Sequence, residues 1–137
     1  MTWTLYFDGS VKYKIGYFGY ILFKDKIEKD RGYGMVGQVS GSLMAEKYAL
    51  SYGLDSFIRH WDSQGSLEIF GDSKMLINSA EKDPDVSPKV KTIQGLGIPM
   101  KLKWIARDRN NLANDLARKM IEDSRTTNKR TSVSSKG

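Results

Sequence analysis

Three acidic residues, Asp8, Glu46 and Asp72, stand at positions from which their carboxylates could meet. Asp8 and Asp72 each end a run of residues typical of a β-strand, and α/β sheets bind ligands at the carboxyl ends of neighbouring parallel strands. Carboxylates in such proximity repel one another unless a cation lies between them. Oxygen ligands of this kind suit Mg²⁺ or Mn²⁺. The residue types therefore predict a divalent-metal site, provided that the two strands are neighbours.

Each of these carboxylates also has an ordinary structural explanation. Asp8 precedes a glycine, which is a common turn signal. Asp72 stands where a helix N-cap is expected, a role that either Asp72 or Ser73 would fill. Glu46 falls inside the apolar stripe of a predicted helix, where a glutamate costs several kcal/mol unless an ion pair or a cation compensates it. A position at the rim of the helix would also explain Glu46 without a metal.

The elements that must position these residues follow from the period of the apolar residues. Alternation and aromatic or β-branched content predict strands at 2–10, 17–23, 27–36, 67–72 and 100–104. In the last strand, Met100, Leu102 and Trp104 are predicted to face inward. Helical spacing predicts helices at 42–61, from 73 to before 83 and at 110–122. The poorly patterned connector between the last two leaves room for a short helix near 87–94. Ser40 or Ser42 is the predicted N-cap of the first helix.

This order of elements predicts an α/β fold. The first three strands, joined by short links, form an antiparallel meander, whereas the later alternation of strand and helix requires parallel crossovers. The result is a mixed five-stranded sheet, in the order β-β-β-α-β-α-β-α, flanked by helices.

The last predicted helix offers two candidates for a fourth ligand. At 100° per residue, Asn114 lies on the flank of the apolar stripe, whereas Asp115 points nearly opposite, into solvent. If this helix contributes to the site, geometry selects Asn114, a neutral oxygen donor, over the stronger ligand beside it. Otherwise Asn114 is a polar flank residue and Asp115 an ordinary solvated charge. The stripe comprises Leu112, Ala113, Leu116, Ala117, Met120 and Ile121.

Together these residues resemble type-1 ribonuclease H from about Thr2 to Glu122. The resemblance rests on four matching segments: Asp8-Gly9-Ser10, Ala45-Glu46, Asp72-Ser73 and Arg107 through Ala117. It implies a ribonuclease H-like fold and an endoribonuclease that hydrolyses the RNA strand of RNA–DNA hybrids. The reaction would use two Mg²⁺ or Mn²⁺ ions per site and leave 5′-phosphate and 3′-hydroxyl ends.

The resemblance also implies which residues act. The family pattern Asn-x-x-Ala-Asp-x-Leu-Ala corresponds to residues 110–117, so the fourth acidic position is an asparagine. The implied catalytic residues and metal ligands are Asp8, Glu46, Asp72 and Asn114. The implied substrate-binding residues are Gly9, Ser10, Lys14, Gly41, Ser42, Lys74 and Arg107.

Several positions depart from the family. An Asn-Pro-Gly segment is Lys14-Ile15-Gly16 here, a Thr-Asn-Asn segment is Gly41-Ser42-Leu43, and a glutamine is Lys74. Those positions contact phosphate or ribose 2′-OH groups in the family; Lys14 and Lys74 would hold phosphates as point charges. No histidine lies between Trp104 and Asn110, and residues 83–99 are too few for the basic helical handle of some members.

Composition bounds the remaining possibilities. The chain has 137 residues and no cysteine, which excludes a disulfide framework, a thiolate nucleophile and a Cys-based zinc site. Its net charge of +6 favours a polyanionic partner. No apolar run approaches the roughly 18 residues of a membrane span. We expect a cytoplasmic monomer with no membrane contact, acting on RNA–DNA hybrid, with double-stranded RNA as a second candidate partner.

Two further interpretations follow from the same residues. Residues 1–122 are predicted to form one domain, and the basic, Ser/Thr/Lys-rich segment 123–137 is predicted to be a disordered tail. The alternative function is a catalytically weakened or inactive module that binds hybrid or double-stranded RNA on the same fold, with Asn114 marking a decaying site. The three retained acids argue against that alternative, because Glu46 would be a liability without a metal. Another nuclease or polynucleotidyl transferase on this fold is less favoured for so short a chain.

Overall fold

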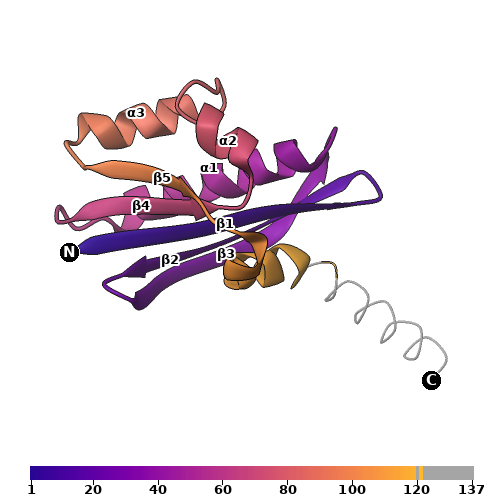
Figure 1. Cartoon of the computed structure of the whole chain (residues 1–137), viewed down its shortest axis with the longest axis horizontal. Coiled ribbons are helices and arrows are strands. Elements are labelled where there is room, and N and C mark those ends of the chain that lie inside the picture. Colours follow the sequence, from indigo (N-terminus) through magenta and orange to yellow (C-terminus); the bar gives the residue numbers. More distant parts are fainter. Residues whose placement is uncertain (120, 122–137) are drawn as a thin grey trace.

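Strand β1 (Thr2–Lys12) lies at the centre of a five-stranded sheet in the order β3-β2-β1-β4-β5 (Figure 1). On one side, β2 (Ile15–Lys24) and β3 (Ile27–Gln38) continue it as an antiparallel meander. On the other, β4 (Ser66–Gly71) and β5 (Met100–Trp104) pair in parallel. The mixed five-stranded sheet that the sequence predicts is therefore confirmed.

Helices cover the two faces of the sheet unequally. The long helix α1 (Ser42–His60) packs on one face against β1 and β2, and α2 (Lys74–Ser79) and α3 (Ser87–Gly95) contact α1 (Figure 1). After β5, the short 3₁₀ helix η1 (Arg107–Arg109) leads to a helix over residues 111–119, which lies on the opposite face. The computed structural model describes residues 1–119 and 121, so the predicted tail at 123–137 lies outside the described residues.

Alternation along β1 divides its side chains between these two faces. Trp3, Leu5 and Phe7 point toward α1 and are at most 1 % exposed. Trp3 meets Phe57 of α1 edge to face, with 5.5 Å between the ring centroids. Burying each such side chain contributes about 1.5–3 kcal/mol. The alternate residues, which include Asp8, face the side of the 111–119 helix.

Two local predictions are wrong. The N-cap of α1 is Gly41, in extended conformation and without a side-chain cap hydrogen bond, rather than Ser40 or Ser42. Trp104 is 45 % exposed rather than inward-facing, although Met100 and Leu102 pack against the core as predicted. The reason is that β5 is an edge strand, and at its end the Trp104 indole Nε1 donates a hydrogen bond to the carbonyl of Asp72 at 3.1 Å.

The described helices include none with the length and apolar character that crossing a membrane requires. The longest, α1, carries polar residues along its outer side.

A close approach between β1 and α1 occurs at Gly9. A Cβ added there would lie 2.3 Å from the backbone nitrogen of Glu46 and 2.4 Å from the carbonyl carbon of Ala45. Contacts this short between a side chain and backbone are not tolerated in native packing. Only glycine therefore allows the start of α1 to lie against the end of β1.

Replacing Gly9 with alanine should lower the free energy of unfolding by at least the roughly 1–3 kcal/mol typical of overpacking. Urea denaturation followed by circular dichroism would measure this loss. Gly95→Ala is the matched control, because no heavy atom lies within 4 Å of a Cβ built at Gly95. Equal stability of the Gly9→Ala variant and the control would contradict the proposed contact.

Candidate active site

The structure brings the three predicted carboxylates together. Asp8 is on β1, Glu46 is in the first turns of α1, and Asp72 directly follows β4. One carboxylate oxygen from each lies within 4.8 Å of the others. The parallel pairing of β1 with β4 places Asp8 beside Asp72, and the contact at Gly9 brings in Glu46.

Electrostatics at this cluster favour a bound cation. Burial, together with the negative charges of Asp72 and Glu46, raises the pKa of Asp8 to about 7. Burial also raises the pKa of Glu46, against a hydrogen bond with Ser73. In residues 1–119 and 121, no salt bridge involves any of the three carboxylates. The negative charge is thus uncompensated by ion pairs, and a divalent cation fits the oxygen-only donor set.

The N-cap alternative for Asp72 is resolved in favour of Ser73. The Ser73 hydroxyl accepts a hydrogen bond from the backbone N–H of Leu76 at 3.3 Å, so Ser73 caps α2. The Asp72 carboxylate remains free to face the cluster. Glu46, in turn, is half-buried at the rim rather than enclosed in the core.

Asn110, which directly precedes the 111–119 helix, forms hydrogen bonds that hold the cluster in place. Its side-chain amide Nδ2 donates to the carbonyl of Phe7 at 2.9 Å and to the Asp72 carboxylate at 3.3 Å, and the residue is 1 % exposed. It thus ties the middle of β1 to Asp72 and to the start of the helix. Sequence reasoning missed this role, because Asn110 appeared only as the first residue of a motif. Its position as a polar residue opening a predicted helix was the available signal.

Asn114 is buried and Asp115 exposed, in agreement with the helical-wheel prediction. The Asn114 Nδ2 donates to the carbonyl of Arg107 at 3.0 Å. Its amide oxygen Oδ1 is buried and has no hydrogen-bond partner among the described residues. Asn114 does not line the cleft that holds the carboxylates, and its buried oxygen lacks the partner that such an atom usually has.

The carboxylates line a cleft of about 500 Å³ whose rim is basic. Of the predicted substrate-binding residues, Gly9, Ser10, Ser42 and Arg107 line this cleft. The Ser10 hydroxyl donates to the carbonyl of Ala117 at 2.9 Å, so it also anchors the 111–119 helix.

Two cations in the cleft were missed from the sequence, and three predicted residues lie elsewhere. Lys12 and Arg118 line the cleft. They were missed because neither belongs to the four segments that match the ribonuclease H family. Lys14, Gly41 and Lys74 are not among the lining residues. Lys74 places its ammonium 4.5 Å from the centre of the Trp104 ring, which holds it beside the exposed indole.

No protein-family model and no curated protein matches this sequence. Solved structures do. RNase H1 from the halophilic archaeon Halobacterium salinarum aligns with a TM-score of 0.73 at 23 % identity, over 90 % of this chain and 99 % of that chain. This likeness shows the architecture. The chain has the ribonuclease H-like fold.

Two more structures share the ribonuclease H-like fold with this chain. An N-terminal RNase H domain from Mycobacterium tuberculosis, solved as a fusion with maltose-binding protein, aligns with a TM-score of 0.72 at 19 % identity, over 88 % of this chain and 98 % of that chain. LC11-RNase H1, in complex with an RNA/DNA hybrid, aligns with a TM-score of 0.72 at 18 % identity, over 89 % of this chain and 98 % of that chain.

Without divalent metal, the protein should lose stability as the pH rises from about 4 to about 7. The folded state keeps a proton on Asp8 up to about pH 7, whereas the unfolded chain releases it near its ordinary pKa of 3.8. Because the folded state binds more protons in this range, the free energy of unfolding falls by about 1.4 kcal/mol for each pH unit between the two pKa values. Urea denaturation in EDTA would measure the slope.

The control for this slope is Asp8→Asn, which removes the titrating group and should flatten the dependence. Mg²⁺ or Mn²⁺ should restore stability above pH 7, because the ion replaces the proton as the compensating charge. An identical pH slope in the Asp8→Asn variant would contradict the assignment.

Replacing Asn114 with aspartate should tighten Mg²⁺ binding, because a negatively charged oxygen would take the place of the unpartnered amide oxygen. Isothermal titration calorimetry would measure the affinity. Asp115→Asn is the matched control and should leave the affinity unchanged, because Asp115 is exposed to solvent. Unaltered affinity in Asn114→Asp would remove Asn114 from the set of ligands.

Proposed function

We propose that this protein is a metal-dependent endoribonuclease that hydrolyses the RNA strand of RNA–DNA hybrids and leaves 5′-phosphate and 3′-hydroxyl ends. The observation that carries the proposal is the convergence of Asp8, Glu46 and Asp72 within 4.8 Å on a ribonuclease H-like fold. A carboxylate cluster without ion pairs is electrostatically unfavourable, and such a cluster is typical of a site whose function is to bind a cation.

Asp8, Glu46 and Asp72, with the neutral oxygen of Asn114, would hold Mg²⁺ or Mn²⁺, two ions per site. When bound, such ions activate water and stabilise the charge that develops on phosphoryl oxygens. The protein's own part is to fix the ligands in place. Asn110 orients the Asp72 carboxylate through its hydrogen bond, and Asp8, whose pKa is raised to about 7, would hold the metal in its deprotonated form.

The rim of the cleft would supply the contacts to the nucleic acid. Lys12, Arg107 and Arg118 place positive charge around the carboxylates, where phosphates of a bound duplex would lie. The backbone at Gly41 and Ser42 would face the hybrid, and Lys14 and Lys74 would hold phosphates further out. That LC11-RNase H1 was solved with an RNA/DNA hybrid supports this choice of substrate.

The purified protein should cleave the RNA strand of a labelled RNA–DNA hybrid in Mg²⁺ or Mn²⁺ and not in EDTA. Asp8→Asn should lower the rate at least about 100-fold, since it removes a shared metal ligand. Asp115→Asn should cleave at the wild-type rate. Gel analysis of the cleaved strand, with a double-stranded RNA of the same sequence alongside, would measure both rate and substrate choice. Equal cleavage by Asp8→Asn and wild type would refute the proposal.

A second candidate function is a module that binds hybrid or double-stranded RNA with weak or absent turnover. The neutral Asn114, whose amide donates to the carbonyl of Arg107, favours it, because one ligand position lacks its charge. Salt-dependent binding of the hybrid without cleavage, even in excess Mn²⁺, would select this function over catalysis.

A further inference from the structure

The face of the sheet opposite α1 is only partly covered. The 111–119 helix packs over β2 at Gly19, where an added Cβ would lie 2.4 Å from the backbone nitrogen of Ala117. Phe23, four residues further along β2, lies beyond this contact at the end of the strand. The uncovered part, which we call the open sheet face, comprises Thr4, Tyr6, Phe23 and Phe70.

Three aromatic rings from three adjacent strands form the centre of the open sheet face. Tyr6 on β1 stacks on its strand partner Phe70 on β4, with 5.2 Å between ring centroids. Phe23 on β2 meets Tyr6 edge to face at 6.1 Å. All three side chains are only half-buried. Aromatic residues on an uncovered sheet surface are an arrangement on which nucleobases stack.

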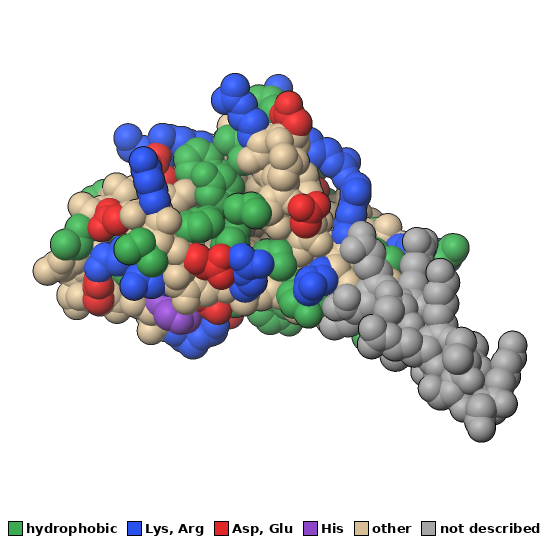
Figure 2. Space-filling view, turned by 90° about the horizontal axis from the view of Figure 1, so that it is seen from below, with side chains coloured by type: hydrophobic (Ala, Val, Ile, Leu, Met, Phe, Trp, Pro, Cys, Tyr) green, Lys and Arg blue, Asp and Glu red, His purple; other side chains and the backbone are tan. Residues whose placement is uncertain are grey.

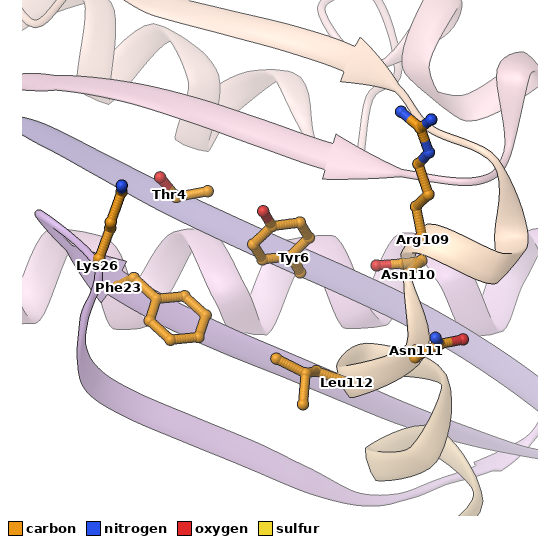
Figure 3. A pocket seen from close by; sticks show the side chains of 8 residues that line it. All are labelled: Thr4, Tyr6, Phe23, Lys26, Arg109, Asn110, Asn111 and Leu112. Carbon is orange, nitrogen blue, oxygen red and sulfur yellow. The ribbon is translucent and has the colours of Figure 1, made fainter.

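Cations border these rings. A cavity of about 420 Å³ lies over Tyr6 and Phe23, with Lys26 at one end and Arg109 at the other (Figure 3). Neither forms a salt bridge within the described part of the chain. Lys103 lies 5.8 Å from the centre of the Phe70 ring and pairs with Glu68.

In the space-filling view, hydrophobic side chains gather on one side of the molecule, with Lys and Arg side chains beside them (Figure 2). The positive charges at the border of the open sheet face indicate what kind of ligand it binds. A second copy of this chain would bring the same positive charges together, whereas a polyanion with flat apolar groups matches both the rings and the charges.

The open sheet face adjoins the carboxylate cluster through one residue. Asn110 lines the cavity over Tyr6, and its amide donates to the Asp72 carboxylate at 3.3 Å. A strand held on this face would therefore pass close to the cleft without occupying it.

We propose that the open sheet face binds single-stranded nucleic acid, with bases packed on Tyr6 and Phe23 and phosphates held by Lys26 and Arg109. This binding requires no metal, so it is independent of the carboxylate cluster and of hybrid cleavage. It gives the protein a second nucleic-acid surface on the other side of Asn110 from the cleft.

The test is the binding of a single-stranded oligothymidylate of roughly ten nucleotides, a length within the usual range for such surfaces, to the full chain in EDTA at low salt. Nuclear magnetic resonance should show amide shift changes at Thr4, Tyr6, Phe23 and Leu112. Fluorescence anisotropy should show that an abasic strand of equal length binds about tenfold more weakly, because it lacks the stacking bases.

Charge reversal locates the surface. Lys26→Glu with Arg109→Glu should weaken binding about tenfold or more, whereas Lys29→Glu with Lys91→Glu, the matched control at exposed lysines outside the cavity, should weaken it far less. Tyr6→Leu should lower affinity for the base-bearing strand but not for the abasic one. Circular dichroism would verify that each variant is folded.

Three results would overturn the proposal. The first is no binding at millimolar protein. The second is loss of binding in Arg107→Glu with Arg118→Glu while Lys26→Glu with Arg109→Glu binds normally, which would place the strand in the cleft. The third is a dimer in sedimentation that Tyr6→Leu dissociates, which would make the face a contact between copies. Because every measurement is made in EDTA, failure here leaves the cleavage proposal untouched, and the reverse also holds.

Discussion

Three carboxylates that repel one another are held within 4.8 Å, and the rest of the structure is arranged around this constraint. Three features impose this proximity: the parallel pairing of β1 with β4, the glycine contact between β1 and α1, and the hydrogen bonds of Asn110 to Phe7 and Asp72. Burial and the neighbouring charges disfavour the ionised form and raise the pKa of Asp8 to about 7, so a proton or a cation at the cluster lowers its free energy. The fold thus stores an electrostatic cost that a bound cation would relieve.

Strand β1 serves three purposes through its alternation. Trp3, Leu5 and Phe7 form the core against α1. Their burial contributes favourable free energy that helps to offset the repulsion within the carboxylate cluster. On the opposite face, Asp8 belongs to the cluster, whereas Tyr6, two residues earlier, belongs to the open sheet face. The 111–119 helix separates these two surfaces, and Asn110 at its start contacts both. Metal chemistry and single-strand binding would therefore share one strand and one helix terminus.

Sequence predictions that rest on the residues of a single strand or helix were confirmed more often than those that rest on contacts between elements. Order and type of the strands and helices followed from period alone, and the mixed sheet is confirmed. The prediction for the N-cap of α1 was wrong, because the cap is Gly41 between the two candidate serines. The predicted direction of Trp104 was wrong because its indole bonds the carbonyl of Asp72, 32 residues earlier in the chain. Lys12 and Arg118 were missed as cleft residues for the same reason, since nothing in their immediate sequence marks the cleft they line.

The sequence by itself determined the elements, the candidate acids and the choice of Asn114 over Asp115, because strand and helix periods specify which way a side chain points within its own element. The tertiary structure alone decided that Asp8, Glu46 and Asp72 meet, that Ser73 rather than Asp72 caps α2, and that Asn110 braces the cluster. It also decided that part of one sheet face stays open beside them. These outcomes depend on contacts between residues as many as 103 positions apart, and periodicity carries no information about such contacts.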